Sequence, residues 1–148
     1  MSDEVASEER RFVDTNILVY AHDKDAGSKI EIAQELIAGL WEARAGCVSV
    51  QVLQELFVSL TRKVAPLLPV PAATAQIEDL VAWTVHAPGS RDVLSAIDLG
   101  ERAGISFWDA MILTSARSLG CRVVYSEDLN AGQTYDGVLV VNPFAPDS

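Results

Sequence analysis

Four acidic residues in this sequence each stand beside an apolar segment, at a predicted strand or helix boundary: Asp14, Glu55, Asp109 and Asp128. Carboxylates brought within a few ångströms of one another raise each other's pKa values, and bound cations offset that cost. Oxygen ligands without His or Cys favour Mg²⁺ or Mn²⁺ over zinc. One or two such ions can acidify a bound water and stabilise the departing oxygen of a phosphodiester. The four acids therefore indicate metal-dependent phosphodiester chemistry, provided that the fold brings them together.

Residues 12–20 form an apolar run that is interrupted by Asp14, Thr15 and Asn16. The run predicts a buried strand that continues into a helix, with Asp14 at the carboxyl end of the strand. Ligands of open parallel sheets bind at these ends, so we expect Asp14 to face the functional crevice. A simpler alternative is that Asp14 only caps the helix by accepting hydrogen bonds from its free N–H groups.

A second acidic stretch repeats this geometry later in the chain. Residues 122–125 predict an apolar strand, and Ser126, Glu127 and Asp128 follow it at once. The carboxyl ends of parallel strands lie at the same edge of a sheet, so Asp14 and Asp128 can converge. Either Glu127 or Asp128 could turn inward, and Asp128 could instead be a simple turn former.

The other two acids also have structural explanations of their own. Glu55 lies near the first turns of a helix predicted from residue 52 to a point before Pro66, where it could be a solvated surface residue. Asp109 stands three residues after Ser106, at the start of the most apolar helix, where a capping box places an acid. Only the set of four therefore points to a site.

The remaining segments alternate between helices and strands. Ser28 and Glu31 have the spacing of a capping box before a helix that reaches about residue 44. The prolines of residues 66–71 predict an irregular connection. Further helices are predicted at residues 72–83, 90–103 and 106–119, and further strands at 46–50, 85–87 and 138–141. This alternation predicts an α/β fold, a three-layer α/β/α sandwich with a mainly parallel central sheet.

Length and composition fit one domain. The chain has 148 residues, of which 49% are hydrophobic. Residues 1–11 hold four acids and little apolar content, which predicts a flexible acidic tail before a single domain at residues 12–148. The formal net charge of −10 argues against tight binding of nucleic acid through a basic surface alone.

The sequence also bears on the compartment. It shows neither the pattern of a secretory signal nor a run of about 18 apolar residues, so we expect a cytoplasmic protein without membrane contact. Cys47 and Cys121 each lie at the edge of an apolar segment, far apart and without further ligands at metal spacing. We expect buried free thiols, with a disulfide as the alternative.

At this point the motifs resemble those of a known family. The ordered set resembles PIN-domain ribonucleases, and most of all bacterial VapC-type toxins, from Phe12 to Phe144. The matching stretches are Phe12-Val13-Asp14-Thr15-Asn16, Glu55, Phe107-Trp108-Asp109-Ala110, Ser126-Glu127-Asp128-Leu129 and Asn142-Pro143-Phe144. Each motif is weak alone, but the order and spacing of the set are specific.

The resemblance implies a metal-dependent endoribonuclease that hydrolyses RNA with Mg²⁺ or Mn²⁺, is inhibited by a cognate antitoxin protein and assembles as a homodimer. The implied catalytic and metal residues are Asp14, Glu55, Asp109 and Asp128. Asn16 would orient Asp14 or a metal-bound water, and Ser126 would donate a hydrogen bond in the same pocket. Asp128 is preferred over Glu127 because the family pattern has a hydroxyl residue two positions before the acid.

Two other function classes compete with this one. A non-catalytic PIN-like module could use the pocket only to hold a partner protein. The loss of one of the four acids would favour this alternative, but all four are present. A phosphatase with Asp14 as nucleophile would have, in its commonest family, an acid two residues later, and position 16 is Asn.

Several conspicuous side chains are expected outside the chemistry. His22 and His86 are poor candidates for a general base, and His22 is more simply a solvated imidazole near a helix end. Tryptophans and apolar residues at helical spacing are expected in the core rather than as base-stacking platforms. They are Trp41, Trp83 and Trp108, and Val93, Leu94, Ile97 and Leu99 of the predicted helix 90–103. The expected contacts to an RNA backbone are Arg91, Arg102 and Arg117.

Overall fold

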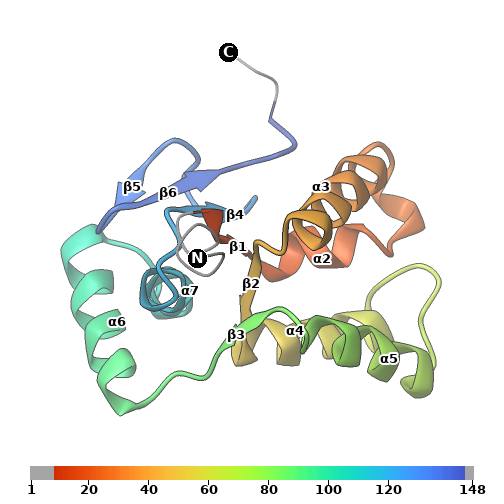
Figure 1. The fold of residues 1–148 in the computed structure, drawn as a ribbon, viewed down its shortest axis with the longest axis horizontal. Helices are drawn as coiled ribbons and strands as arrows, with labels where there is room; N and C mark the ends of the chain where they lie inside the picture. The colour runs from red at the N-terminus through yellow and green to blue at the C-terminus, as the bar shows by residue number, and fades with distance from the viewer. Residues whose placement is uncertain (1–8, 146–148) are drawn as a thin grey trace.

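A six-stranded sheet forms the centre of the computed structural model, which describes residues 9–145 (Figure 1). The strand order is β3-β2-β1-β4-β6-β5. The strands are β1 (Arg11–Val13), β2 (Gly46–Ser49), β3 (Thr84–His86), β4 (Val123–Tyr125), β5 (Thr134–Tyr135) and β6 (Val138–Val141). All neighbouring pairs are parallel except β5 and β6, which are antiparallel.

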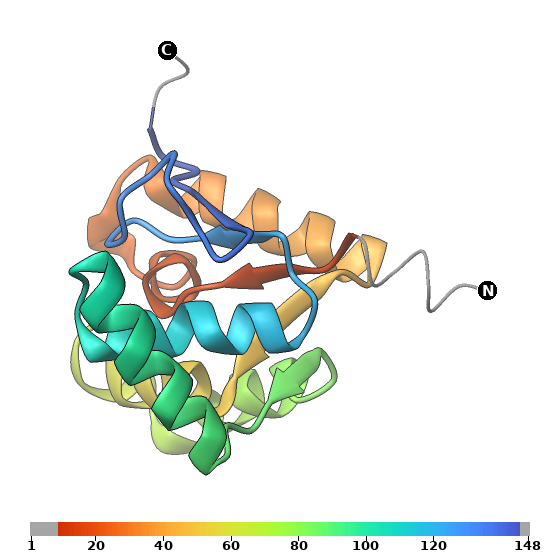
Figure 2. The ribbon, with the colours of Figure 1, turned by 90° about the vertical axis from the view of Figure 1, so that its left-hand side faces the viewer.

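Helices cover both faces of the sheet. The α-helices are α2 (Thr15–Tyr20), α3 (Lys29–Ala43), α4 (Val50–Arg62), α5 (Val70–Leu80), α6 (Ser90–Ala103) and α7 (Phe107–Ser118), and a short 3₁₀ helix, η1, spans Lys24–Ala26. Figures 1 and 2 show α7 against one face with α6 outside it, and helices α2 to α5 on the other side. The predicted three-layer α/β/α sandwich with a mainly parallel sheet is confirmed.

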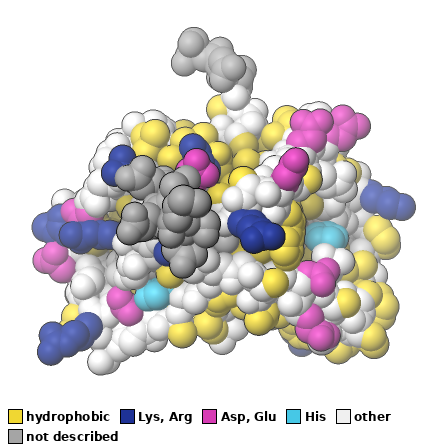
Figure 3. Space-filling view, in the orientation of Figure 1, with side chains coloured by type: hydrophobic (Ala, Val, Ile, Leu, Met, Phe, Trp, Pro, Cys, Tyr) yellow, Lys and Arg dark blue, Asp and Glu magenta, His cyan; other side chains and the backbone are white. Residues whose placement is uncertain are grey.

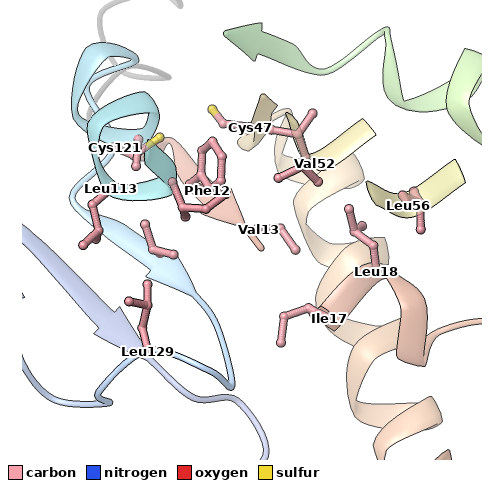
Figure 4. Packing of buried hydrophobic residues seen from close by; sticks show 14 of the residues in the cluster. Phe12, Val13, Ile17, Leu18, Cys47, Val52, Leu56, Leu113, Cys121 and Leu129 are labelled. Carbon is pink, nitrogen blue, oxygen red and sulfur yellow. The ribbon is translucent and has the colours of Figure 1, made fainter. Parts of the chain in front are cut away.

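The core lies on both sides of β1. Phe12 and Val13 are fully buried, and Figure 4 shows them between Leu113 of α7 and Val52 and Leu56 of α4. Apolar side chains on both faces of a strand are typical of a parallel sheet that helices cover twice. This central position of β1 fixes the place of the residue that follows it, Asp14.

The predicted start of α5 and the predicted cap of α3 are wrong. Helix α5 begins at Val70 rather than residue 72, and Pro71 lies in its first turn. Proline is tolerated there because a first-turn N–H has no partner within the helix. Ser28 precedes α3, but its side chain makes no capping hydrogen bond, so the predicted capping box with Glu31 is not formed.

The burial predicted for α6 is also wrong in part. Leu99 is buried, but Val93, Leu94 and Ile97 are exposed. The reason is that α6 packs outside α7 rather than on the sheet, so only a narrow face that includes Ala96 is buried. The helix ends at Ala103, as predicted, and Gly104 follows it in the left-handed conformation.

Other expectations concern the ends and the thiols. Most of the predicted tail, residues 1–11, lies outside the described residues, but Arg11 begins β1, one residue before the predicted domain start. Cys47 and Cys121 are free and buried, as expected. Across residues 9–145, every helix is too short or too polar to cross a lipid bilayer.

Candidate functional site

A pocket of about 580 Å³ opens at the carboxyl ends of the central strands. Its walls come from the junction of β1 and α2, from α4, from α7 and from the loop after β4. All four acids singled out by the sequence line it: Asp14, Glu55, Asp109 and Asp128. The fold thus brings together residues that are up to 114 positions apart in the chain.

Asp14 is the most firmly held of these acids. It is the N-cap of α2, and its Oδ1 accepts a hydrogen bond from Thr15 N at 2.7 Å. Its Oδ2 accepts one from Ser126 Oγ at 2.8 Å. Asp14 therefore caps the helix and lines the pocket at the same time, so the two alternatives are not exclusive.

Burial makes Asp14 a weaker acid than an ordinary aspartate in the absence of a cation. The residue is only 7% exposed, and this burial is the main cause that raises its pKa to about 6. The hydrogen bonds from Ser126 and Thr15 act in the opposite direction, and the nearby charges of Asp128 and Glu55 raise the pKa further. A cation in the pocket would relieve both the burial and the repulsion.

Ser126 joins the two acidic stretches. Its Oγ donates to Asp14 and accepts from Asp128 N at 3.2 Å and Leu129 N at 3.4 Å. The hydroxyl, which is fully buried, therefore fixes the loop after β4 against the end of β1.

The two acids after Ser126 point to different places. Asp128 lines the pocket. The Glu127 carboxylate instead accepts hydrogen bonds from Tyr20 Oη and from Lys29 Nζ, the latter at 2.5 Å. Although partial burial acts to raise the pKa of Glu127, these two contacts hold it below its ordinary value. Of these two acids, Asp128 is the one that lines the pocket, and its role as a ligand stays a prediction.

Glu55 and Asp109 complete the acidic wall from two helices. Glu55 Oε1 accepts a hydrogen bond from Thr15 Oγ1 at 2.7 Å. The start of α7 is capped by Ser106, whose Oγ accepts from Asp109 N at 3.1 Å. Among the described contacts, the Asp109 carboxylate makes no return bond to Ser106. The predicted capping box is therefore only half formed, and the carboxylate is left free in the pocket wall.

Asn16 does not orient Asp14 directly. Its Oδ1 lies 3.5 Å from Glu127 N, which donates to it, and its Nδ2 is buried without a hydrogen-bond partner among the described residues. Asn16 also lines the pocket. An unpaired buried donor is costly, and an oxygen of a bound water or ligand would satisfy it.

The donor set of the pocket fits a hard cation. Within residues 9–145, no three His, Cys, Asp or Glu side chains are close enough to share one metal ion. The acids therefore line the pocket without forming a closed cage. Mg²⁺ commonly keeps several waters and takes one or two carboxylates, which this arrangement offers.

Two further pocket residues were missed or misplaced by the sequence reasoning. Lys63 lines the pocket. It is the C-cap of α4 and continues the four-residue spacing of Gln51, Glu55 and Ser59 on that helix. That spacing places them on one helix face and could have revealed Lys63. Trp108, expected in the core, also lines the pocket and is 63% exposed.

Other candidates lie elsewhere. The His86 ring Nδ1 is 2.9 Å from Ser115 Oγ, and burial lowers the pKa of His22, which lines a separate cavity. Arg102 and Arg117 pair with Asp136 at 3.1 and 3.5 Å, away from the acidic pocket. Among the described residues, Lys63 rather than these arginines is the basic side chain that lines the pocket.

The fold is similar to those of several solved bacterial proteins. The Mycobacterium tuberculosis VapC20 toxin, described as cleaving the sarcin-ricin loop, has a TM-score of 0.62 at 21% identity, covering 80% of this chain and 89% of that one. A toxin–antitoxin complex from Klebsiella pneumoniae has a TM-score of 0.63 at 18% identity, covering 90% and 98%. DNA-bound VapBC from Salmonella typhimurium gives 0.62 at 20% identity, covering 88% and 96%.

The sequence comparisons define the family. No curated protein sequence matches the chain significantly. The family model described as PIN domain matches residues 11–136, which include all four acids of the pocket. The chain therefore belongs to the PIN-domain family.

Proposed function

We propose that this protein is an endoribonuclease that uses Mg²⁺ or Mn²⁺ at the acidic pocket. The observation that carries the proposal is the convergence of Asp14, Glu55, Asp109 and Asp128 on one pocket of a PIN-domain fold. A bound metal ion would lower the pKa of the attacking water and neutralise charge that develops on the phosphate. Water attack would leave a 5′-phosphate and a 3′-hydroxyl.

The protein's own residues have separate roles in this proposal. Asp14, held by Thr15 and Ser126, gives the cation a ligand of fixed orientation. The other three carboxylates are less constrained and would adjust to the ion. Asn16 Nδ2 would donate to a water or phosphate oxygen, and Lys63 would pair with a backbone phosphate.

Charge explains why a metal ion is needed. The formal net charge is −10, and the face drawn in Figure 3 shows Lys and Arg in separate groups rather than as one basic surface. Phosphates would be repelled by four acids in the absence of cations. Bound Mg²⁺ or Mn²⁺ would reverse the sign of the local charge and make RNA binding compatible with an acidic protein.

We further propose that the protein is the toxin of a toxin–antitoxin pair. Support comes from the similar structures, which include complexes of toxins with antitoxins and a toxin described as cleaving the sarcin-ricin loop. The antitoxin would place an Arg or Lys against the pocket acids, where it would pair with them as the metal ion does.

A cleavage assay on single-stranded RNA tests the proposed activity. We expect cleavage with Mg²⁺ or Mn²⁺ and none in EDTA, because without a cation the pocket offers a phosphate only repulsion. Asp14→Asn should abolish cleavage. A matched control is Asp98→Asn, which removes an exposed carboxylate of α6 that pairs with Arg102. Full activity in EDTA, or undiminished activity of Asp14→Asn, would refute the proposal. A folded protein that binds Mn²⁺ but cleaves no RNA would favour a binding module.

A further inference from the structure

Trp108 is an exposed aromatic wall of the acidic pocket, whose lining also includes Tyr20 and the apolar side chains of Val19, Val58 and Ile112. It is the second residue of α7, directly before Asp109, and 63% of its side chain is exposed. The aromatic rings of Phe107 and Trp108 pack edge to face, with their centroids 5.1 Å apart and their planes at 73°. The Trp108 side chain thus lies at the pocket with most of its surface open to solvent.

The other two tryptophans lie away from the acidic pocket. Trp83 is 8% exposed and covers Gly46, where an added Cβ would come within 2.5 Å of the indole ring. Trp41 packs edge-on against Trp83, with ring centroids 5.5 Å apart. Trp83 is therefore accounted for by packing. Trp41, which was also expected in the core, is 40% exposed but does not line the acidic pocket, so Trp108 is the exposed indole at this pocket among the described residues.

The chemistry of the pocket selects an occupant that is both anionic and flat. The acids would hold a cation, and Lys63 is the one Lys or Arg among the described residues that line the pocket. These groups suit phosphate oxygens, whereas an exposed indole suits the face of a nucleobase. Every nucleotide of single-stranded RNA has both a phosphate and an exposed base face. Base stacking on aromatic side chains is a common mode of RNA binding.

We propose that Trp108 stacks on a base of the RNA strand whose phosphate lies at the acidic pocket. The proposal rests on the ribonuclease function proposed above and names a substrate-binding residue for it. Because Trp108 is adjacent to Asp109 in the chain, the stacked base belongs to a nucleotide at or next to the cleaved bond. Stacking is tolerant of base identity, so Trp108 selects unpaired RNA over duplex rather than one sequence.

Steady-state cleavage of a single-stranded RNA by Trp108 variants tests this. Trp108→Ala should raise KM by roughly 5-fold to 100-fold, the range expected for the loss of one base stack, with kcat changed by less than about threefold. Trp108→Phe keeps an aromatic face and should recover most of the lost affinity. Trp41→Ala is the matched control and should leave KM unchanged, with melting curves showing that all variants are folded.

An RNA carrying one abasic nucleotide makes the test specific for stacking. The abasic nucleotide is placed in turn at each position around the cleaved bond. It should raise the KM of the wild-type protein at the one position whose base stacks on Trp108. At that position it should have no further effect on Trp108→Ala, because the contact is already absent. Equal KM values for wild type and Trp108→Ala, with normal wild-type cleavage, would overturn the stacking role alone. A wild-type protein that cleaves no RNA would overturn the proposed function and the stacking role with it.

Discussion

Each oxygen of the buried Asp14 carboxylate accepts one hydrogen bond, from Thr15 N at 2.7 Å and from Ser126 Oγ at 2.8 Å. A carboxylate offers about four lone-pair directions, so both oxygens keep capacity for a cation. The two bonds also fix the orientation of the group before any ligand arrives. Helix capping and metal binding are therefore compatible uses of one side chain.

The pKa of Asp14 predicts how the stability of the metal-free protein depends on pH. Burial raises this pKa from 3.8 to about 6, so the folded state holds the proton more tightly than the unfolded state between these values. The free energy of unfolding should therefore fall as pH rises from about 4 to about 6, by roughly 3 kcal/mol for this group.

Denaturant titrations in EDTA check this dependence. Asp14→Asn lacks the titrating group. Its free energy of unfolding should therefore rise relative to that of wild type by about 3 kcal/mol between pH 4 and pH 7. Parallel stability curves for wild type and variant over this range would show that Asp14 is not buried as described.

Asp109→Asn separates the metal role of Asp109 from a role in helix capping. The cap of α7 is made by the Ser106 hydroxyl and the Asp109 backbone, which the substitution keeps. We expect the metal-free stability to change by less than about 1 kcal/mol, the size of a helix-dipole effect. Metal affinity and RNA cleavage should fall together, by at least about tenfold.

Ser106→Ala should have the opposite effects on stability and metal affinity. It removes the cap and should cost about 1 kcal/mol of stability while metal affinity stays near the wild-type value. An Asp109→Asn protein that is less stable without metal, yet cleaves RNA at the wild-type rate, would remove Asp109 from the site.

Between elements, the register of β1 and β4 determines the contact at the centre of the pocket. Val13 pairs with Tyr125 in the parallel ladder, so Asp14 and Ser126 follow one residue beyond the last pair on each strand. The loop that begins at Ser126 is held from outside by the Glu127 contacts with Tyr20 and Lys29. These contacts turn Glu127 away from the pocket and leave Asp128 at it.

Glu127→Ala is predicted to weaken the site without removing a ligand. Lys29 Nζ also lies 4.7 Å from the centroid of the Tyr20 ring and 5.5 Å from that of Phe144, so its partner Glu127 is part of a packed cluster. Without this anchor the loop that carries Asp128 should be less well fixed. Metal affinity should fall by about 10-fold to 100-fold, as for other residues that orient a ligand.

Mn²⁺ titration of Glu127→Ala measures that effect. Glu35→Ala, a change at an exposed acid of the same helix as Lys29, should leave Mn²⁺ affinity unaltered and serves as the control. Equal Mn²⁺ affinity in Glu127→Ala and wild type would mean that the cluster only packs the surface.

The sequence predicted those features that depend on local pattern. The strand ends at Asp14 and Ser126 followed from apolar runs beside polar residues, and the family resemblance assigned Asp128 over Glu127. The exposure of Trp108 and of Leu94 could not be predicted, because helical periodicity identifies an apolar face but not whether another element covers it. The contacts of Glu127 with Lys29 depend on side chains 98 positions apart, which no local pattern encodes.

At the scale of the whole molecule, expression of the chain should slow bacterial growth. An unrestrained ribonuclease depletes RNA, so we predict growth arrest on induction in a host without the cognate antitoxin. Asp14→Asn at the same soluble level should be harmless. Normal growth with abundant soluble wild-type protein would contradict the toxin function. The homodimer implied by the family resemblance stays a prediction that light scattering of the purified protein can check.

Direct binding of Mn²⁺ tests the central claim that the four-carboxylate pocket is a metal site. Electron paramagnetic resonance of free Mn²⁺ gives the affinity, and thermal melting gives the linked stability. At about 100 times its Kd, Mn²⁺ should add about 2.7 kcal/mol to the folded state and raise Tm by roughly 5–10 °C. Asp14→Asn should lose at least about tenfold in affinity and, at the same Mn²⁺ concentration, at least about half of the Tm shift, whereas Asp98→Asn should keep both. Equal Mn²⁺ affinity and equal Tm shifts in wild type and Asp14→Asn would contradict the claim.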